Sequence, residues 1–127
     1  MAELTVAIGG FGTIGAKVAK ALDDGMSGLR LVAVSAQDHD GARSRMGDMR
    51  SPPPVVELKK LASLADVVVE CAPAGVFREV ALAAIEAGRI FIPLSCGALL
   101  RQPDLVPLAV QTGARIIVPT GALLGLD

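Results

Sequence analysis

The stretch that decides the fold is LTVAIGGFGTIG, residues 4–15. Residues 4–8 are largely apolar and β-branched, which predicts a strand, and the glycines that follow predict a tight turn opening into a helix. Gly10, Gly12 and Gly15 form the pattern G-x-G-x-x-G. This pattern is weak alone, but it gains meaning when it lies between a strand and a helix, as it does here.

Each glycine of this turn has its own role in the chemistry that the pattern predicts. Gly10 permits the tight turn, Gly12 lets a pyrophosphate approach the backbone, and Gly15 allows the helix to pack closely on the strand. The helix N-terminus then offers free N–H groups and a partial positive charge to phosphates. The alternative is a structural turn with no ligand. If a dinucleotide binds, we expect contacts at Gly10, Phe11, Gly12, Thr13 and Ile14.

Short apolar runs alternate with longer amphipathic stretches along the rest of the chain. Strands are predicted at residues 4–8, 29–34, 55–56, 67–71, 90–94 and 116–118. Helices are predicted at residues 13–24, 73–87 and 103–112, with a short helix around 42–49 and a short helix or turn at 57–64. Because crossovers between parallel strands are right-handed, the alternation predicts one α/β domain. We expect a Rossmann-type doubly wound parallel sheet of about six strands in the order 3-2-1-4-5-6.

The composition suits such a sheet and argues against several other classes of protein. Of the 127 residues, 52% are hydrophobic and only 2% aromatic, which is typical of Val-, Ile-, Leu- and Ala-rich parallel sheets. The net charge of -1 argues against a nucleic-acid partner, and no apolar run reaches the ~20 residues of a membrane span. Without a leader-like N-terminus, a cytoplasmic protein is expected. Cys71 and Cys96 should then be free thiols that form no metal site.

The end of the second strand should hold the residues that recognise the cofactor's adenosine ribose. An acid at this point favours NAD by holding the ribose hydroxyls, but the matching position is Ala36. Gln37 and Asp38 follow it, and Asp38 could reach the ribose if the loop bends inward. Arg43 and Arg45 could instead bind the 2′-phosphate of NADP, or be solvated helix residues. The choice between NAD and NADP therefore stays open.

Several further motifs together resemble one family. They are VECA at residues 69–72, LSCGAL at 94–99, and PTGA at 119–122 followed by GLD at 125–127. With the glycine turn, they resemble the N-terminal domain of L-aspartate dehydrogenase and, more distantly, homoserine dehydrogenase. The resemblance extends over essentially the whole chain.

The resemblance implies a cofactor, a reaction and further site residues. The cofactor would be NAD or NADP, and hydride would move between its nicotinamide and C2 of aspartate, giving iminosuccinate and then oxaloacetate and ammonia. Ala72 and Pro73 would lie beside the nicotinamide ribose, and Ser95, Gly97 and Ala98 would shape the nicotinamide pocket. Ala122 matches a position that contacts NAD in the family. The alternative is that these small residues only form tight turns.

The resemblance also implies that no catalytic residue lies in this chain. The family takes its catalytic histidine from a second domain, whereas His39, the only histidine here, matches no catalytic position. We expect His39 to be an exposed loop residue and the substrate domain to lie outside residues 1–127. The alternative is a free-standing NAD(P)-binding module or sensor. In either case, the surface that would meet a second domain could join a homodimer.

Glu70 stands out because it follows three consecutive valines in the fourth strand. An unpaired carboxylate is costly to bury there. We interpret Glu70 as a structural residue that accepts hydrogen bonds from loop N–H groups. A role in orienting a substrate ammonium or a cofactor ribose is the alternative.

Overall fold

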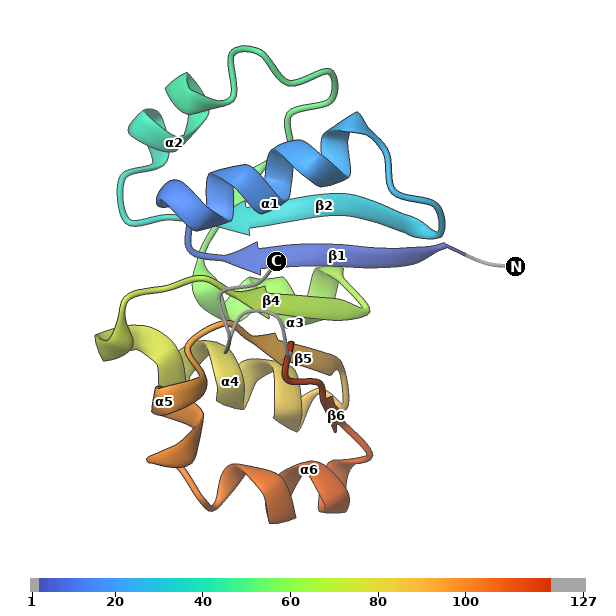
Figure 1. The fold of residues 1–127 in the computed structure, drawn as a ribbon, viewed down its shortest axis with the longest axis vertical. Coiled ribbons are helices and arrows are strands. Elements are labelled where there is room, and N and C mark those ends of the chain that lie inside the picture. The colour runs from blue at the N-terminus through green and yellow to red at the C-terminus, as the bar shows by residue number, and fades with distance from the viewer. Residues whose placement is uncertain (1–2, 120–127) are drawn as a thin grey trace.

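A computed structural model describes residues 3–119 of the chain. The described residues form one parallel sheet with strands in the order β3-β2-β1-β4-β5-β6. Figure 1 shows β2, β1, β4 and β5 side by side in this order. The strands are β1 (Leu4–Gly9), β2 (Leu29–Ser35), β3 (Val55–Val56), β4 (Val67–Glu70), β5 (Ile90–Pro93) and β6 (Arg115–Ile116). The predicted Rossmann-type sheet and its strand order are therefore confirmed.

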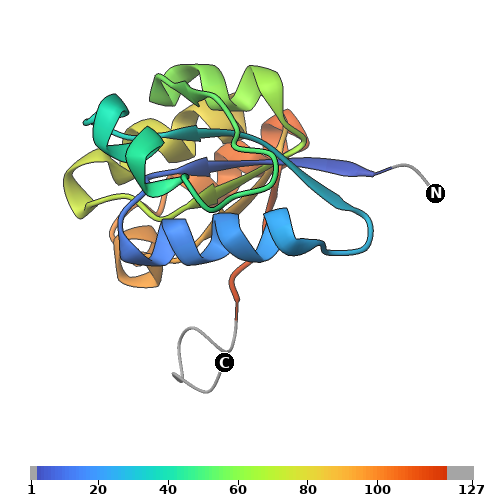
Figure 2. The ribbon, with the colours of Figure 1, turned by 90° about the horizontal axis from the view of Figure 1, so that it is seen from above.

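Helices cover both faces of this sheet. The α-helices are α1 (Thr13–Asp24), α2 (His39–Arg45), α3 (Leu61–Leu64), α4 (Phe77–Glu86), α5 (Cys96–Leu100) and α6 (Leu105–Thr112), with short 3-10 turns η1 (Leu58–Lys60) and η2 (Ala74–Val76). Figure 2 shows α1 on one side of the sheet and α3 and α4 on the other. No helix of the described part is long and apolar enough to cross a membrane.

Alternating side chains of the central strands build two separate hydrophobic cores. Val6 and Ile8 of β1 pack with α1 and α2, whereas Ala7 between them packs with α3, α4 and α6. Val68 of β4 lies in this second core, where the rings of Phe77 and Phe91 meet edge to face at 5.9 Å. Because every other residue of a strand faces the same way, a continuous apolar run supplies both cores.

The predicted strands are all present, with ends that differ by one or two residues, but the helices needed more correction. The second helix begins at His39 rather than at residue 42, because the Asp38 carboxylate accepts a hydrogen bond from the backbone N–H of Gly41 at 2.9 Å and caps it. Helix α5 was not predicted at all. Its five residues are too few to show a helical period, and they follow β5 almost directly.

Candidate functional site

The glycine turn lies at the carboxyl end of β1, where its three glycines meet different surroundings. Gly10 has a φ of 110°, and a Cβ added to it would lie 2.6 Å from the carbonyl oxygen of Cys71. A Cβ on Gly15 would collide with the carbonyl oxygen of Gly10. A Cβ on Gly12 would meet no described atom within 4 Å. Two glycines therefore serve the packing of the turn, whereas Gly12 leaves an open approach to the backbone.

The N-terminus of α1 is free to meet an anion. Gly12 is its N-cap, and among the described residues no side chain caps it and no acidic residue occupies its first turn. Gly12, Thr13 and Ile14 are exposed. The first backbone N–H groups of a helix lack intrahelical partners, and the helix dipole adds partial positive charge there. This end of α1 can bind phosphate oxygens.

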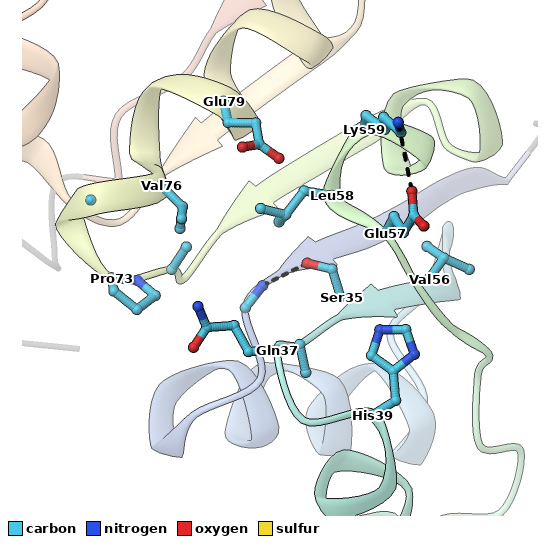
Figure 3. Close-up of a pocket in the computed structure, with 14 residues that line it drawn as sticks. Ser35, Gln37, His39, Val56, Glu57, Leu58, Lys59, Pro73, Val76 and Glu79 are labelled. Carbon is cyan, nitrogen blue, oxygen red and sulfur yellow. Dashed lines mark hydrogen bonds and ion pairs between the residues drawn. The ribbon is translucent and has the colours of Figure 1, made fainter.

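A cavity of about 650 Å³ opens beside the glycine turn. Its walls come from the segments that follow β1, β2, β3 and β4, as Figure 3 shows. The lining residues are Gly10 with residues 35–37, 39, 56–59, 72–73, 75–76 and 79. In open α/β sheets, ligands bind outside the carboxyl ends of the strands, and this cavity has that position.

The structure separates the candidate residues that follow β2. Gln37 and His39 line the cavity together with Ala36. Asp38 is absent from the described lining residues, and its carboxylate caps α2. The prediction that His39 is an exposed loop residue was wrong, because the Asp38 cap starts the helix early. His39 is half-buried as the first residue of α2.

The two arginines of α2 lie away from this cavity. The Arg43 guanidinium pairs with the Asp40 carboxylate at 3.2 Å on the surface. The Arg45 guanidinium lies 5.7 Å from the centre of the Phe11 ring, beside a second, smaller hollow along α1. Neither arginine is among the described residues that line the 650 Å³ cavity.

Glu70 ties together the loops that follow β4 and β5. It is fully buried. One carboxylate oxygen accepts the backbone N–H of Ser95 at 2.9 Å, and the other accepts the N–H of Ala72 at 3.0 Å and the Ser95 hydroxyl at 2.9 Å. These contacts agree with the structural interpretation of Glu70. Three donors already surround its carboxylate, so little of it is left for a ligand.

The cysteines are free, as expected, and the described residues contain no cluster of side chains suited to a metal ion. Burial, and to a lesser extent the Glu70 carboxylate, raises the pKa of the Cys71 thiol to about 12. Because the thiolate is the nucleophile, Cys71 is unsuited to covalent chemistry near neutral pH.

The residues predicted for the nicotinamide end fall into two groups. Ala72 and Pro73 line the cavity. Ser95, Gly97 and Ala98 lie at the start of α5 and are not among the described residues that line the cavity. Ser95 is joined to Ala72 through Glu70. Ala122 lies outside the described residues. Sequence reasoning missed a set of cavity residues at and after β3, in η2 and in α4, for which no motif gave a signal: Val56, Glu57, Leu58, Lys59, Gly75, Val76 and Glu79.

Known proteins resemble this chain in sequence and in fold. It is 47% identical to L-aspartate dehydrogenase of Bradyrhizobium diazoefficiens over 98% of its length and 44% of the relative's. It is 44% identical to L-aspartate dehydrogenase 3 of Bordetella bronchiseptica over 98% of its length and 46% of the relative's. The chain thus spans less than half the length of these relatives.

A solved structure supports the assignment of the fold, and a match to a family model supports the assignment of the sequence family. Biliverdin reductase from Synechocystis, 18% identical, superposes with a TM-score of 0.76 over 95% of this chain and 39% of its own. The family model described as the NAD-binding domain of homoserine dehydrogenase matches residues 10–119. The resemblance to L-aspartate dehydrogenase drawn from the sequence motifs is confirmed. The chain therefore belongs to the homoserine dehydrogenase NAD-binding domain family.

Proposed function

We propose that this chain is the cofactor-binding part of an L-aspartate dehydrogenase and that it holds NAD(H) or NADP(H) across the carboxyl ends of β1, β2, β4 and β5. The observation that carries the proposal is the uncapped N-terminus of α1 beside a cavity of about 650 Å³. An anion site next to a mainly apolar pocket suits a molecule that joins a pyrophosphate to two nucleosides.

The fold suggests how the cofactor would lie. The pyrophosphate would meet the backbone of Gly12, Thr13 and Ile14, which is exposed at the start of α1. The adenosine would occupy the cavity between Gln37, which follows β2, and Pro73, which follows β4. Gly10, which lines the cavity, and the backbone of Phe11, whose side chain packs in the core, are also proposed contacts.

The nicotinamide end would lie toward the loops after β4 and β5. Ala72, Ser95, Gly97 and Ala98 are the proposed contacts, and Ala122 is proposed from the family motif. Small side chains let a flat ring approach the backbone. Glu70 would fix the positions of Ala72 and Ser95 relative to each other, because its carboxylate accepts hydrogen bonds from both backbone N–H groups.

The reaction proposed is that named for the relatives, the oxidation of L-aspartate or its reversal. The bound cofactor would accept or supply the hydride at C2, and this chain would bind and orient it. We assign residues 1–127 to the dinucleotide-binding domain and the acid–base group to a separate substrate domain. His39, the only histidine, supports this assignment because it lies after β2 in the adenosine part of the cavity.

The setting and assembly of the enzyme are also proposed. Two free thiols suit the reducing cytoplasm, and a net charge of -1 gives no reason to expect a nucleic-acid partner. Homodimerisation is proposed because exposed apolar side chains gather on α5 and α6, namely Leu100, Val106 and Val110. Light scattering would test this, and a monomer at all concentrations would contradict it.

Calorimetric titration with NADH and NADPH tests cofactor binding. The Gly12→Val variant should bind either cofactor at least about tenfold more weakly, because the new side chain covers the approach to the helix N-terminus. It should fold normally, since a Cβ at Gly12 meets no described atom within 4 Å. Gly47→Val is the matched control, since its Cβ would make only an ordinary 3.5 Å contact with the Ser44 carbonyl oxygen.

Three results would each contradict a part of the proposal. Failure of the unaltered chain to bind either cofactor would refute cofactor binding, and full affinity in Gly12→Val would refute the placement of the pyrophosphate. Residues 1–127 should show negligible aspartate oxidation with either cofactor. Robust turnover would refute the assignment of the acid–base group to a separate domain.

A further inference from the structure

We propose that the adenosine end of this cavity accepts a 2′-phosphate, so that the chain binds NADP(H) at least as tightly as NAD(H), with His39 as the specificity-determining residue. This inference rests on the proposed function, because it assumes that the adenosine lies in the cavity beside the glycine turn. It concerns only the groups that would face the ribose.

NAD selectivity normally requires a carboxylate at the end of β2. The carboxylate accepts hydrogen bonds from the ribose hydroxyls and repels a phosphate at the 2′ position. Here the last residue of β2 is Ser35, which is 1% exposed, and its Oγ and carbonyl oxygen each accept the backbone N–H of Gly10 at 3.2 Å. Ala36 follows with a methyl group. Neither residue can replace the carboxylate.

Asp38 carries the nearest carboxylate along the chain, and this carboxylate caps α2. Its Oδ1 accepts the backbone N–H of Gly41 at 2.9 Å. The carboxylate packs so closely on Gly41 that a Cβ there would collide with Oδ2. To reach the ribose, Asp38 would have to give up the cap that starts α2. In this structure, the ribose end of the cavity therefore lacks the group that excludes NADP.

The polar groups that do face this end suit a phosphate. The Gln37 amide and the His39 imidazole both line the cavity, and both carry N–H donors. Figure 3 shows them on the same side of the cavity, with Glu79 on the far side. The remaining charged lining groups are Glu57 and Lys59, which pair with each other at 3.8 Å. Asp38 and Asp40, which flank His39 along the chain, are not among the described lining residues. Their carboxylates instead bind the Gly41 N–H and the Arg43 guanidinium.

Arg45 is the competing source of positive charge. Its guanidinium lies over the Phe11 ring, next to the separate hollow along α1 that also contains Lys17 and Lys20. It would have to leave this position to meet a phosphate in the cavity. The position of His39 on the cavity wall makes it the better placed of the two, and the two residues can be compared directly by substitution.

The test measures binding of NADPH and NADH, and of 2′,5′-ADP and 5′-AMP, to the unaltered chain and to three variants. The unaltered chain should bind NADPH at least as tightly as NADH, and 2′,5′-ADP more tightly than 5′-AMP. Ala36→Asp should raise the ratio of the NADPH to the NADH dissociation constant at least about tenfold, because it restores the excluding carboxylate. His39→Ala should raise this ratio at least about tenfold, the loss expected for one hydrogen bond to a charged group. Arg45→Ala should leave it within about twofold.

The outcomes separate this inference from the proposed function. If neither NADPH nor NADH binds, the proposed function fails. If NADH binds at least about tenfold more tightly than NADPH, the cofactor site stands and the inference is overturned. A ratio that responds to Arg45→Ala and not to His39→Ala would overturn the role of His39.

Discussion

Replacing Glu70 with Gln exchanges one carboxylate oxygen for an NH₂ group at the centre of the candidate site. The Glu70 carboxylate accepts the N–H of Ala72, the N–H of Ser95 and the Ser95 hydroxyl. A glutamine offers one carbonyl oxygen and one NH₂ group. If the glutamine oxygen faces Ala72, its NH₂ group faces the Ser95 N–H. If the amide is turned the other way, its NH₂ group faces the Ala72 N–H. A hydroxyl can turn to accept instead, but a backbone N–H cannot, so each orientation leaves one N–H without an acceptor.

The magnitude follows from that single unsatisfied donor. Leaving a buried donor unpaired costs about 1–3 kcal/mol, so Glu70→Gln should lower the free energy of unfolding by this amount. Glu70→Ala removes the acceptor of all three donors and leaves a cavity, and should cost roughly 3–5 kcal/mol. Because a domain is stable by only about 5–15 kcal/mol, the alanine variant should be close to the limit of folding at room temperature.

Urea denaturation followed by circular dichroism measures these losses. Glu86→Gln, which alters an exposed carboxylate at the end of α4, is the control and should change the free energy of unfolding by less than about 0.5 kcal/mol. Combining Glu70→Ala with Ser95→Ala should cost less than the sum of the two single changes, because both remove the same hydroxyl–carboxylate bond. A Glu70→Gln variant as stable as the Glu86 control would refute the reasoning.

Three further predictions test other contacts. Gly10→Ala should destabilise the fold by at least about 1–3 kcal/mol in the same urea assay, because its φ is 110° and its Cβ would lie 2.6 Å from the Cys71 carbonyl oxygen; unchanged stability would contradict the geometry of the turn. Because the pKa of Cys71 is raised to about 12, roughly one Cys71 thiol in 10⁴ should be ionised at pH 8. Mass spectrometry of a Cys96→Ala variant should therefore show very slow alkylation of Cys71. Rapid alkylation would contradict the burial of Cys71. Hydrogen bonds from the Thr5 N–H and hydroxyl hold the pKa of Asp66 below its usual 3.8, so the ionised form stabilises the fold above that pH. Asp66→Asn should therefore lower the melting temperature at pH 6, and its difference from the unaltered chain should shrink as pH falls below 3.8; a difference independent of pH would contradict this linkage.

The strands could be predicted because their pattern is both local and redundant. Val67, Val68 and Val69 supply one side chain after another to opposite cores, so no other element suits them as well. The glycine turn was predictable because its pattern lies directly between a strand and a helix, and the contact that requires Gly15 is local, with the Gly10 carbonyl oxygen. The contact that requires Gly10 is with the Cys71 carbonyl oxygen, far along the chain, and no local pattern shows it. Helix α5 had no such signal. Ser95 is at its N-cap position, but the Ser95 hydroxyl bonds to Glu70 instead of capping the helix.

The contacts of the residues that end and follow β2 resisted prediction because Asp38 and Ser35 each have two plausible partners. Asp38 can hold a ribose or cap α2, and Ser35 can face a ligand or accept the Gly10 N–H. Only the folded structure shows that both have internal partners. The same cap that engages Asp38 begins α2 at His39 and brings this residue to the cavity wall. A single hydrogen bond thus holds a carboxylate away from the cavity and brings an imidazole to its wall. If the adenosine lies where we propose, the choice between NAD and NADP depends on how this loop is capped as well as on which residues it contains.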